Sequence, residues 1–216
     1  MKKLAIPKVD VNIDNIAALN ALLDTLPANE VCEVNWAEQY PSKPSVNFRI
    51  AHNSKNLILR YDVRENEILA QVEKDNGDVW QDSCVEMFLA FDSEHYYNLE
   101  CNCIGSVLLR YQDNEQKLIH YFTPQRLSRI KRYPSLERKK VDKQQGDFQW
   151  SVLLIIPHTT FKESKIIDFD GITLKGNFYK CGDNLTQPHF LSWNKIDWPT
   201  PNFHLTQFFG DIHTCE

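Results

Sequence analysis

Residues 80–100 hold the side chains of this sequence that are best suited to binding a ligand. Trp80 follows the turn-forming pair Asn76-Gly77, and Glu86 lies inside an apolar run that begins at Ser83. Alternate residues of a strand share a face, so Glu86 shares its face with apolar neighbours. Those neighbours are Cys84, Phe88 and Ala90. Burying a carboxylate there is costly without a partner, so Glu86 either makes a structural ion pair or faces a ligand.

The next period-2 segment carries a second set of polar groups. In the run from His95 to Cys103, Asn98 and Glu100 fall on one face together with Tyr96 and Asn102. Amides and carboxylates together supply the donors and acceptors that vicinal hydroxyl groups of a sugar require. The alternative is that this face is the solvated side of an edge hairpin.

Two of the five tryptophans lie where an indole could remain uncovered. Trp80 stands between a turn and a strand, and Trp193 ends the segment His189–Trp193 and leads into a proline-rich tail. A tryptophan at a strand end or in a loop can offer a flat apolar surface to the C–H face of a pyranose. Trp150, within an aliphatic strand, is expected in the core.

The segments that must position these residues are mostly strands. Apolar residues alternate with polar ones over nine short segments, most of them separated by turn-forming residues. These segments are 45–52, 56–63, 67–73, 83–91, 96–103, 106–111, 148–156, 173–179 and 189–193. One helix is expected over 14–24, with Asp14 as its N-cap and Pro27 beyond its end. The pattern predicts an all-β antiparallel sandwich or jelly-roll with one short N-terminal helix.

Composition agrees with one folded unit. The 216 residues are 42% hydrophobic and 25% charged, and they contain no internal repeat and no Ser/Gly-rich linker. We therefore expect a single domain over residues 1–216, in which residues 1–30 form an N-terminal extension that holds the helix.

Charge and hydropathy exclude other classes of protein. The net charge of −5 argues against nucleic acid as a partner, and the longest aliphatic run, Val152 to Ile156, is far shorter than a membrane span. The basic start, Met1 to Pro7, is followed by polar residues before any apolar signal region forms. From this we expect a cytoplasmic location, or a periplasmic or secreted one if a leader has been removed.

Metal and cofactor sites have weak support. Six cysteines are too few for a disulfide scaffold, and Cys101, Cys103 and Cys181 lack the paired spacing of a zinc site. Calcium could bind at Asp75, Asn76 and Asp78, although no EF-hand spacing occurs. Met87 is expected to point away from the Glu86 face, which argues against haem ligation. The basic stretch 126–143 is expected to be a solvated hairpin or loop, with an anion-binding patch as the alternative.

Several of these segments in combination resemble family-9 carbohydrate-binding modules. They are Trp80 to Phe88, Tyr96 to Glu100, Trp150 to Pro157 and Gly176 to Asp183. The chain is similar over about residues 30–212 to stand-alone family-9-like proteins of gut Bacteroidetes, which are often labelled endoxylanases. The resemblance implies a DOMON-like β-sandwich and a structural calcium ion in some members.

The resemblance also implies roles for individual residues. In that family two tryptophans clamp a terminal sugar, and a glutamate six positions after the first bonds its hydroxyl groups. These roles fall on Trp80 and Glu86, with Trp193 as the second clamp. Asn98 stands where the family carries an arginine.

We therefore expect a non-catalytic module that binds a mono- or oligosaccharide in the breakdown of xylan-type polysaccharides, alongside glycan-degrading enzymes. Trp80 and Trp193 would stack on the sugar, and Glu86, Asn98 and Glu100 would bond its hydroxyl groups. The alternative is a jelly-roll glycoside hydrolase that uses two of the carboxyl groups of Asp82, Glu86 and Glu100. Such an enzyme needs its two carboxyl groups about 5 to 9.5 Å apart across a cleft.

Overall fold

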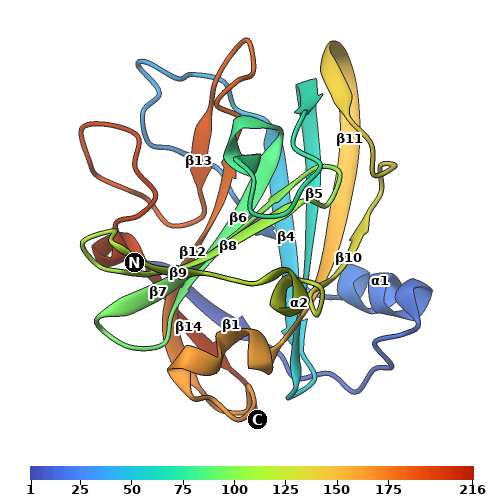
Figure 1. The fold of residues 1–216 in the computed structure, drawn as a ribbon, viewed down its shortest axis with the longest axis vertical. Helices are drawn as coiled ribbons and strands as arrows, with labels where there is room; N and C mark the ends of the chain where they lie inside the picture. The colour runs from blue at the N-terminus through green and yellow to red at the C-terminus, as the bar shows by residue number, and fades with distance from the viewer.

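Two β-sheets pack face to face and enclose most of the apolar side chains (Figure 1). The structure is a computed structural model that describes residues 1–216, apart from the side chain of Leu118. The larger sheet has the order β1 (Lys3–Ile6), β14 (Gly210–Thr214), β12 (Thr173–Cys181), β6 (Cys84–Ala90), β7 (His95–Asn102), β8 (Val107–Asp113) and β9 (Leu118–Tyr121). To this sheet β12 adds β13 (Phe190–Ser192), which in turn pairs with β3 (Glu33–Val34). The predicted all-β sandwich is confirmed.

The smaller sheet is built around two long antiparallel strands. Its order is β10 (Lys131–Pro134), β11 (Val141–Pro157), β5 (Asn56–Ala70), β4 (Ser45–His52) and β2 (Asn29–Glu30). The segments predicted as separate strands at 56–63 and 67–73 belong to the single strand β5. They remain continuous because β11 pairs along the whole length of β5 and absorbs two register shifts.

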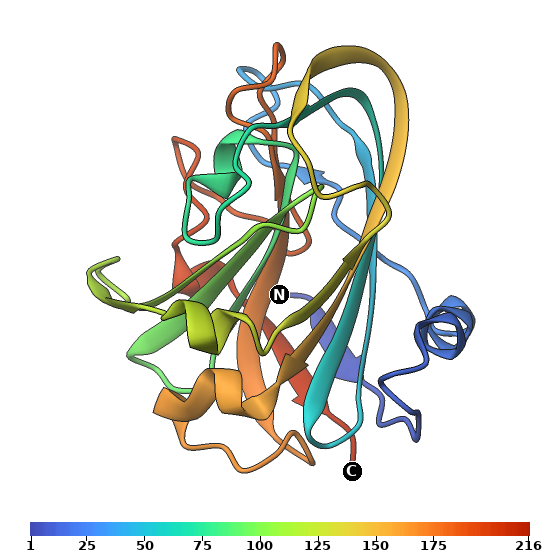
Figure 2. The same ribbon diagram turned by 45° about the vertical axis from the view of Figure 1, so that its right-hand side comes forward.

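Short helices lie outside the sheets. Helix α1 (Ile16–Thr25) begins after Asn15, whose side-chain oxygen accepts a hydrogen bond from the backbone N–H of Ala18 at 3.0 Å, so Asn15 and not Asp14 is the N-cap. Its buried residues Leu19 and Leu23 pack on the outer face of the smaller sheet, where both views place the helix (Figures 1 and 2). The others are α2 (Pro124–Leu127), η1 (Val79–Gln81), η2 (His158–Ser164) and η3 (Thr206–Phe208). None of the helices in the described part of the chain has the length and apolarity that crossing a bilayer demands.

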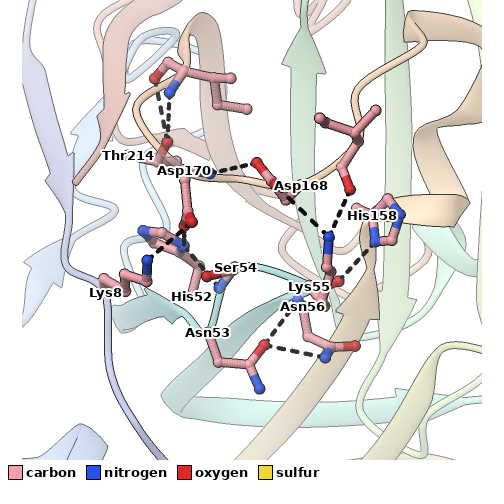
Figure 3. Close-up of polar contacts among 12 residues, drawn as sticks. Lys8, His52, Asn53, Ser54, Lys55, Asn56, His158, Asp168, Asp170 and Thr214 are labelled. Atoms are coloured by element: carbon pink, nitrogen blue, oxygen red, sulfur yellow. Dashed lines mark hydrogen bonds and ion pairs between the residues drawn. The ribbon is translucent and has the colours of Figure 1, made fainter. Parts of the chain in front are cut away.

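The first residues of the chain form part of the larger sheet. Strand β1 pairs in parallel with β14, and its residues Leu4 and Ile6 are buried in the core. The sequence pattern missed both of these short strands. Just beyond β1, the ammonium group of Lys8 contacts the carboxylate of Asp170 at 2.9 Å, in a polar cluster beside the buried His52 (Figure 3). This contact ties the N-terminal segment to the loop before β12.

The larger sheet buries both of its faces. On β6, Val85, Met87 and Leu89 point into the core between the sheets, as their alternation predicts. The opposite face belongs to a second apolar cluster, which includes Cys84, Phe88 and Ala90 and residues after β13. The loops after β13 lie on the side of the larger sheet that faces away from the smaller one (Figure 1). Functional side chains on that outer face of β6 and β7 are therefore covered by protein and not by bulk water.

Candidate functional site

A cavity of about 270 Å³ lies on the outer face of the larger sheet, and we call it the Trp80 cavity. Strands β6, β7, β8 and β12 supply its floor, and the loops after β12 and β13 supply its rim. Its lining residues are Trp80, Glu86, Glu100, Arg110, Cys181, Asp183, Phe190, Pro201, Asn202, Phe203 and His204. It therefore combines carboxyl groups, a guanidinium group and aromatic rings in one hollow.

Glu86 and Glu100 form the polar part of the floor. They are directly opposite each other on the antiparallel strands β6 and β7, and their side chains are almost fully buried. The thiol of Cys181 donates a hydrogen bond to Oε1 of Glu86 at 2.9 Å, and the amide of Asn98 donates to Oε1 of Glu100 at 2.8 Å. Oε2 of Glu100 is buried without a hydrogen-bond partner among the side chains that the structure describes. A ligand in the cavity can supply that missing donor.

Burial controls the protonation of these acids. Loss of hydration raises the pKa of Glu86 to about 8, and burial together with the charge of Glu86 raises the pKa of Glu100 well above its ordinary value. Burial also raises the pKa of Asp183, at the rim, to about 6. Arg110 lowers the pKa of Glu86 and Glu100, but this effect is smaller than that of burial. At neutral pH the floor therefore holds protons and can both donate and accept hydrogen bonds.

Trp80 and Arg110 form one wall of the cavity. Trp80 lies in η1, and the turn after β12 holds this segment through the backbone N–H of Asp183, which donates to the carbonyl oxygen of Trp80 at 3.3 Å. The guanidinium group of Arg110 lies over the rings of Trp80 and Tyr121. Arg110 was missed by the sequence analysis. It reaches this wall because β8 pairs with β7 so that Arg110 is directly opposite Asn98.

Aromatic residues of β13 and of the loop after it also line the cavity. Phe203 stacks on Tyr179 with ring centres 4.2 Å apart, and Phe190 packs edge-on against Phe203. His204 contacts the hydroxyl of Tyr96 through Nδ1 at 2.8 Å. Burial, with a contribution from Arg110, lowers the pKa of His204 to about 4, so this imidazole is neutral at neutral pH.

The predicted role of Trp193 as a clamp at a rim is wrong. Its side chain is 4% exposed and lies in the core between the sheets, edge-on to Phe48 and Phe178. A Cβ atom at Gly210 would lie 2.5 Å from the Trp193 ring, which shows how closely the backbone packs on it. Trp193 directly follows β13 and its ring is enclosed by Phe48, Phe178 and the backbone at Gly210, so it has no face to offer a ligand.

Asn98 and Asp82 have supporting roles. Asn98 does not line the cavity, and its side chain lies beside Glu100, whose carboxylate it bonds. The carboxylate of Asp82 accepts hydrogen bonds from the backbone N–H groups of Gln71 and Val72 at 2.9 and 3.0 Å, and from the side chain of Asn102. Of the three carboxyl groups considered for hydrolysis, only Glu86 and Glu100 line the cavity.

The residues considered for zinc are not brought together. Cys101 and Cys103 face the core between the sheets, whereas Cys181 lies on the outer face. Cys181 instead joins Cys84 and Glu86, and the ligand atoms of these three residues all lie within 4.8 Å of one another. Among the residues that the structure describes, these two thiols and one carboxylate are the group that could hold a metal ion.

Asp75 and Asn76, which were considered as calcium ligands, make contacts that hold neighbouring segments together. The carboxylate of Asp75 forms an ion pair with the guanidinium of Arg132 at 2.6 Å, and the amide of Asn76 donates to the carbonyl oxygen of Phe122 at 2.9 Å.

In the basic stretch, Arg126 likewise forms an ion pair, with the carboxylate of Glu163. The basic stretch 126–143 is thus not simply a solvated loop, because two of its arginines are largely buried in ion pairs and part of it forms α2 and β10.

Comparisons with known proteins agree on one family. Residues 17–214 match the profile of Carbohydrate-binding family 9. A crystal structure of a Bacteroides uniformis protein named as a candidate carbohydrate-binding protein is 37% identical, with a TM-score of 0.93 and 99% of each chain covered. None of the curated proteins matches the chain.

More distant structures share the fold. A family-9 carbohydrate-binding module from Caldicellulosiruptor kristjanssonii has been solved with glucose and with cellotriose. Both structures are 12% identical to this chain, with TM-scores of 0.61, and they cover 99% of it and 95% and 94% of their own chains. At this identity the similarity concerns the fold alone.

Proposed function

Because the chain belongs to carbohydrate-binding family 9, we propose that it binds the terminal sugar of a glycan in the Trp80 cavity and catalyses no reaction on it. The observation that carries this proposal is that the indole of Trp80 and the carboxyl groups of Glu86 and Glu100 line one cavity. An indole suits the C–H face of a pyranose, and a floor that both donates and accepts suits its hydroxyl groups.

Phe190 and Phe203 take the place that we expected Trp193 to fill. They line the same cavity as Trp80, so we expect a sugar ring to contact both the indole and phenyl groups. If the ring covers about 60 to 80 Å² of indole, the apolar contribution is about 1.5 to 2 kcal/mol. Hydrogen bonds of about 1 kcal/mol each add to this, and association costs at least about 4 kcal/mol. The balance gives dissociation constants of about micromolar to millimolar, which suit a targeting module.

The named ligands of the distant relatives guide the choice of sugar. The Caldicellulosiruptor module was solved with glucose and with cellotriose, so glucose and β-1,4-linked glucans are the first ligands to test. Xylan-type oligosaccharides follow from the resemblance of the sequence to stand-alone members of the family. We propose a role in polysaccharide breakdown beside glycan-degrading enzymes.

Hydrolysis is the less favoured function. Glu86 and Glu100 are neighbours on one floor, and Asp82 is bonded to backbone groups elsewhere. A hydrolase needs two carboxyl groups that flank the scissile bond. The position of Glu86 and Glu100 on directly opposite residues of adjacent strands supports the binding function over hydrolysis.

Isothermal titration calorimetry against glucose, cellobiose, xylobiose and longer oligosaccharides tests the binding. Trp80→Ala should weaken binding by ~10-fold or more, because it removes the apolar contact of about 1.5 to 2 kcal/mol. Trp198→Ala is the matched control, since Trp198 is 44% exposed and lies outside the cavity. Equal affinity of the Trp80 and Trp198 variants would contradict the proposed site. Release of reducing sugar by the unmodified protein, lost in Glu86→Gln, would favour the hydrolase instead.

A further inference from the structure

The Trp80 cavity has more acidic than basic groups. Glu86, Glu100 and Asp183 line it, and Arg110 is the cationic side chain in its lining. The guanidinium of Arg110 lies against two aromatic rings, and among the described side chains no ion pair joins it to any of the three acids. The acids therefore lack a direct counter-charge inside the cavity.

Neighbouring elements supply only the more distant charge of Lys180, which lowers the pKa of Glu86 and Asp183 by less than burial raises it. Lys180, next to Cys181 on β12, points to the other side of the sheet, where its ammonium group lies 2.9 Å from the carboxylate of Glu65. Cys84 and Cys181 are neutral thiols, because burial raises the pKa of both above the ordinary value. His204 at the rim is neutral. Tyr96 on β7 and Tyr179 on β12 also lie on this face; burial raises the pKa of both phenols, and their hydroxyl groups contact His204 and the backbone oxygen of Phe203.

One acceptor in the floor is both buried and unused. Oε2 of Glu100 has no hydrogen-bond partner, although the Glu100 side chain is 3% exposed and lines the cavity. Glu86 is directly opposite on β6, and its Oε1 accepts only a weak hydrogen bond, from the thiol of Cys181. Two carboxyl groups on directly opposite residues repel each other when both are ionised, and a bound cation relieves that repulsion.

We propose that the Trp80 cavity prefers a sugar that carries a free ammonium group, such as a 2-amino-2-deoxyhexose, over the corresponding neutral sugar. This inference rests on the proposed function. The sugar ring packs beside Trp80, and its ammonium group donates to Glu100 and Glu86. The bound cation gives these two carboxyl groups a direct counter-charge inside the cavity. Charge-assisted hydrogen bonds of this kind are roughly twice as strong as neutral ones.

The experiment compares three free sugars by calorimetry near neutral pH: glucosamine, N-acetylglucosamine and glucose. Glucosamine should bind ~10-fold more tightly than glucose, which corresponds to about 1.4 kcal/mol. N-acetylglucosamine, which has the same skeleton but no charge, should not share this gain.

Variants separate the charge from the rest of the site. Glu100→Gln and Asp183→Asn should each reduce the ratio of the glucosamine affinity to the glucose affinity, whatever they do to the affinity for glucose itself. Thermal unfolding monitored by near-ultraviolet circular dichroism confirms that each variant is folded. The use of two acids on different elements keeps the test valid if one variant does not fold.

The possible failures are distinguishable. If glucose binds and glucosamine binds no better, or if N-acetylglucosamine gains as much as glucosamine, the ammonium preference is wrong and the proposed function stands. If the ratio is unchanged in both variants, the acids of the cavity are not its cause and the inference is also wrong. If none of these sugars nor any oligosaccharide binds, the proposed function itself fails.

Discussion

The guanidinium carbon of Arg110 lies 5.1 Å from the ring centre of Trp80, so the cation lies over the indole. The same group also lies 5.2 Å from the ring centre of Tyr121. Each cation–π contact is worth about 0.5–1 kcal/mol at an exposed site. The wall of the cavity is thus ordered before a sugar arrives, and the donors of Arg110 already lie beside the surface on which we expect a sugar to stack.

Replacing Arg110 should weaken sugar binding. Arg110→Ala removes charge-assisted hydrogen bonds to sugar hydroxyl groups, each worth about 1.5–3 kcal/mol, so affinity should fall by ~10-fold or more. Arg110→Lys keeps the charge but loses the planar guanidinium group, so its affinity should lie between those of the unmodified protein and Arg110→Ala. Calorimetry with the best-binding oligosaccharide gives both values. An Arg110→Ala protein that binds as tightly as the unmodified one would show that Arg110 only covers the indole.

Trp193 should affect stability and not recognition. Trp193→Ala opens a hole between Phe48 and Phe178, and we expect the free energy of unfolding to fall by about 3–5 kcal/mol. Urea unfolding measures this loss, with Trp198→Ala as the exposed control. A Trp193→Ala protein with unchanged stability and lost sugar binding would restore Trp193 as a clamp.

Glu86 should make the folded protein less stable as the pH rises. Its pKa is raised from 4.5 to about 8 in the folded state, so between these values the unfolded chain binds fewer protons. The free energy of unfolding should therefore fall as the pH increases toward 8, by on the order of 1 kcal/mol per pH unit.

His204 acts in the opposite direction, but at lower pH. Its pKa is lowered from 6.5 to about 4, so its contribution to stability rises with pH only between these values. Urea unfolding between pH 6.5 and 8 therefore reports on the buried acids Glu86 and Glu100 and not on His204. Glu86→Gln should make the profile less steep in this range, because it removes one of the two acids. If the free energy of unfolding of Glu86→Gln falls as steeply with pH as that of the unmodified protein, the proton is bound by a group other than Glu86.

The buried pair of Lys180 and Glu65 joins the two sheets. Lys180 is fully buried on β12, and its ammonium group lies 2.9 Å from the carboxylate of Glu65 on β5, which also accepts from the indole N–H of Trp150 at 2.6 Å. Lys180→Met leaves that carboxylate without its cation, and we expect a loss of about 3–5 kcal/mol in the free energy of unfolding.

A double variant tests the origin of that loss. Lys180→Met combined with Glu65→Leu removes both charges, so it should be more stable than Lys180→Met alone. Urea unfolding of the two single variants and the double variant gives the coupling energy. Strictly additive losses would mean that the two side chains do not stabilise each other.

The sequence by itself determined which residues share a face. The alternation along 83–91 separates Glu86 from Met87, and the structure places them on opposite sides of β6 as predicted. The strand Ser45–His52 was predicted with its observed bounds. Such features depend only on neighbouring residues, because the two-residue period of an extended chain is a local property.

Only the tertiary structure decided which of these faces is open. Trp80 and Trp193 look alike in sequence, but the first lines a cavity and the second is sealed in the core. Arg110 enters the site because β8 is in register with β7, and β1 finds β14 at the other end of the chain. Strand register, and the course of the loops that cover a sheet, come from contacts between distant segments, and no local pattern encodes these contacts.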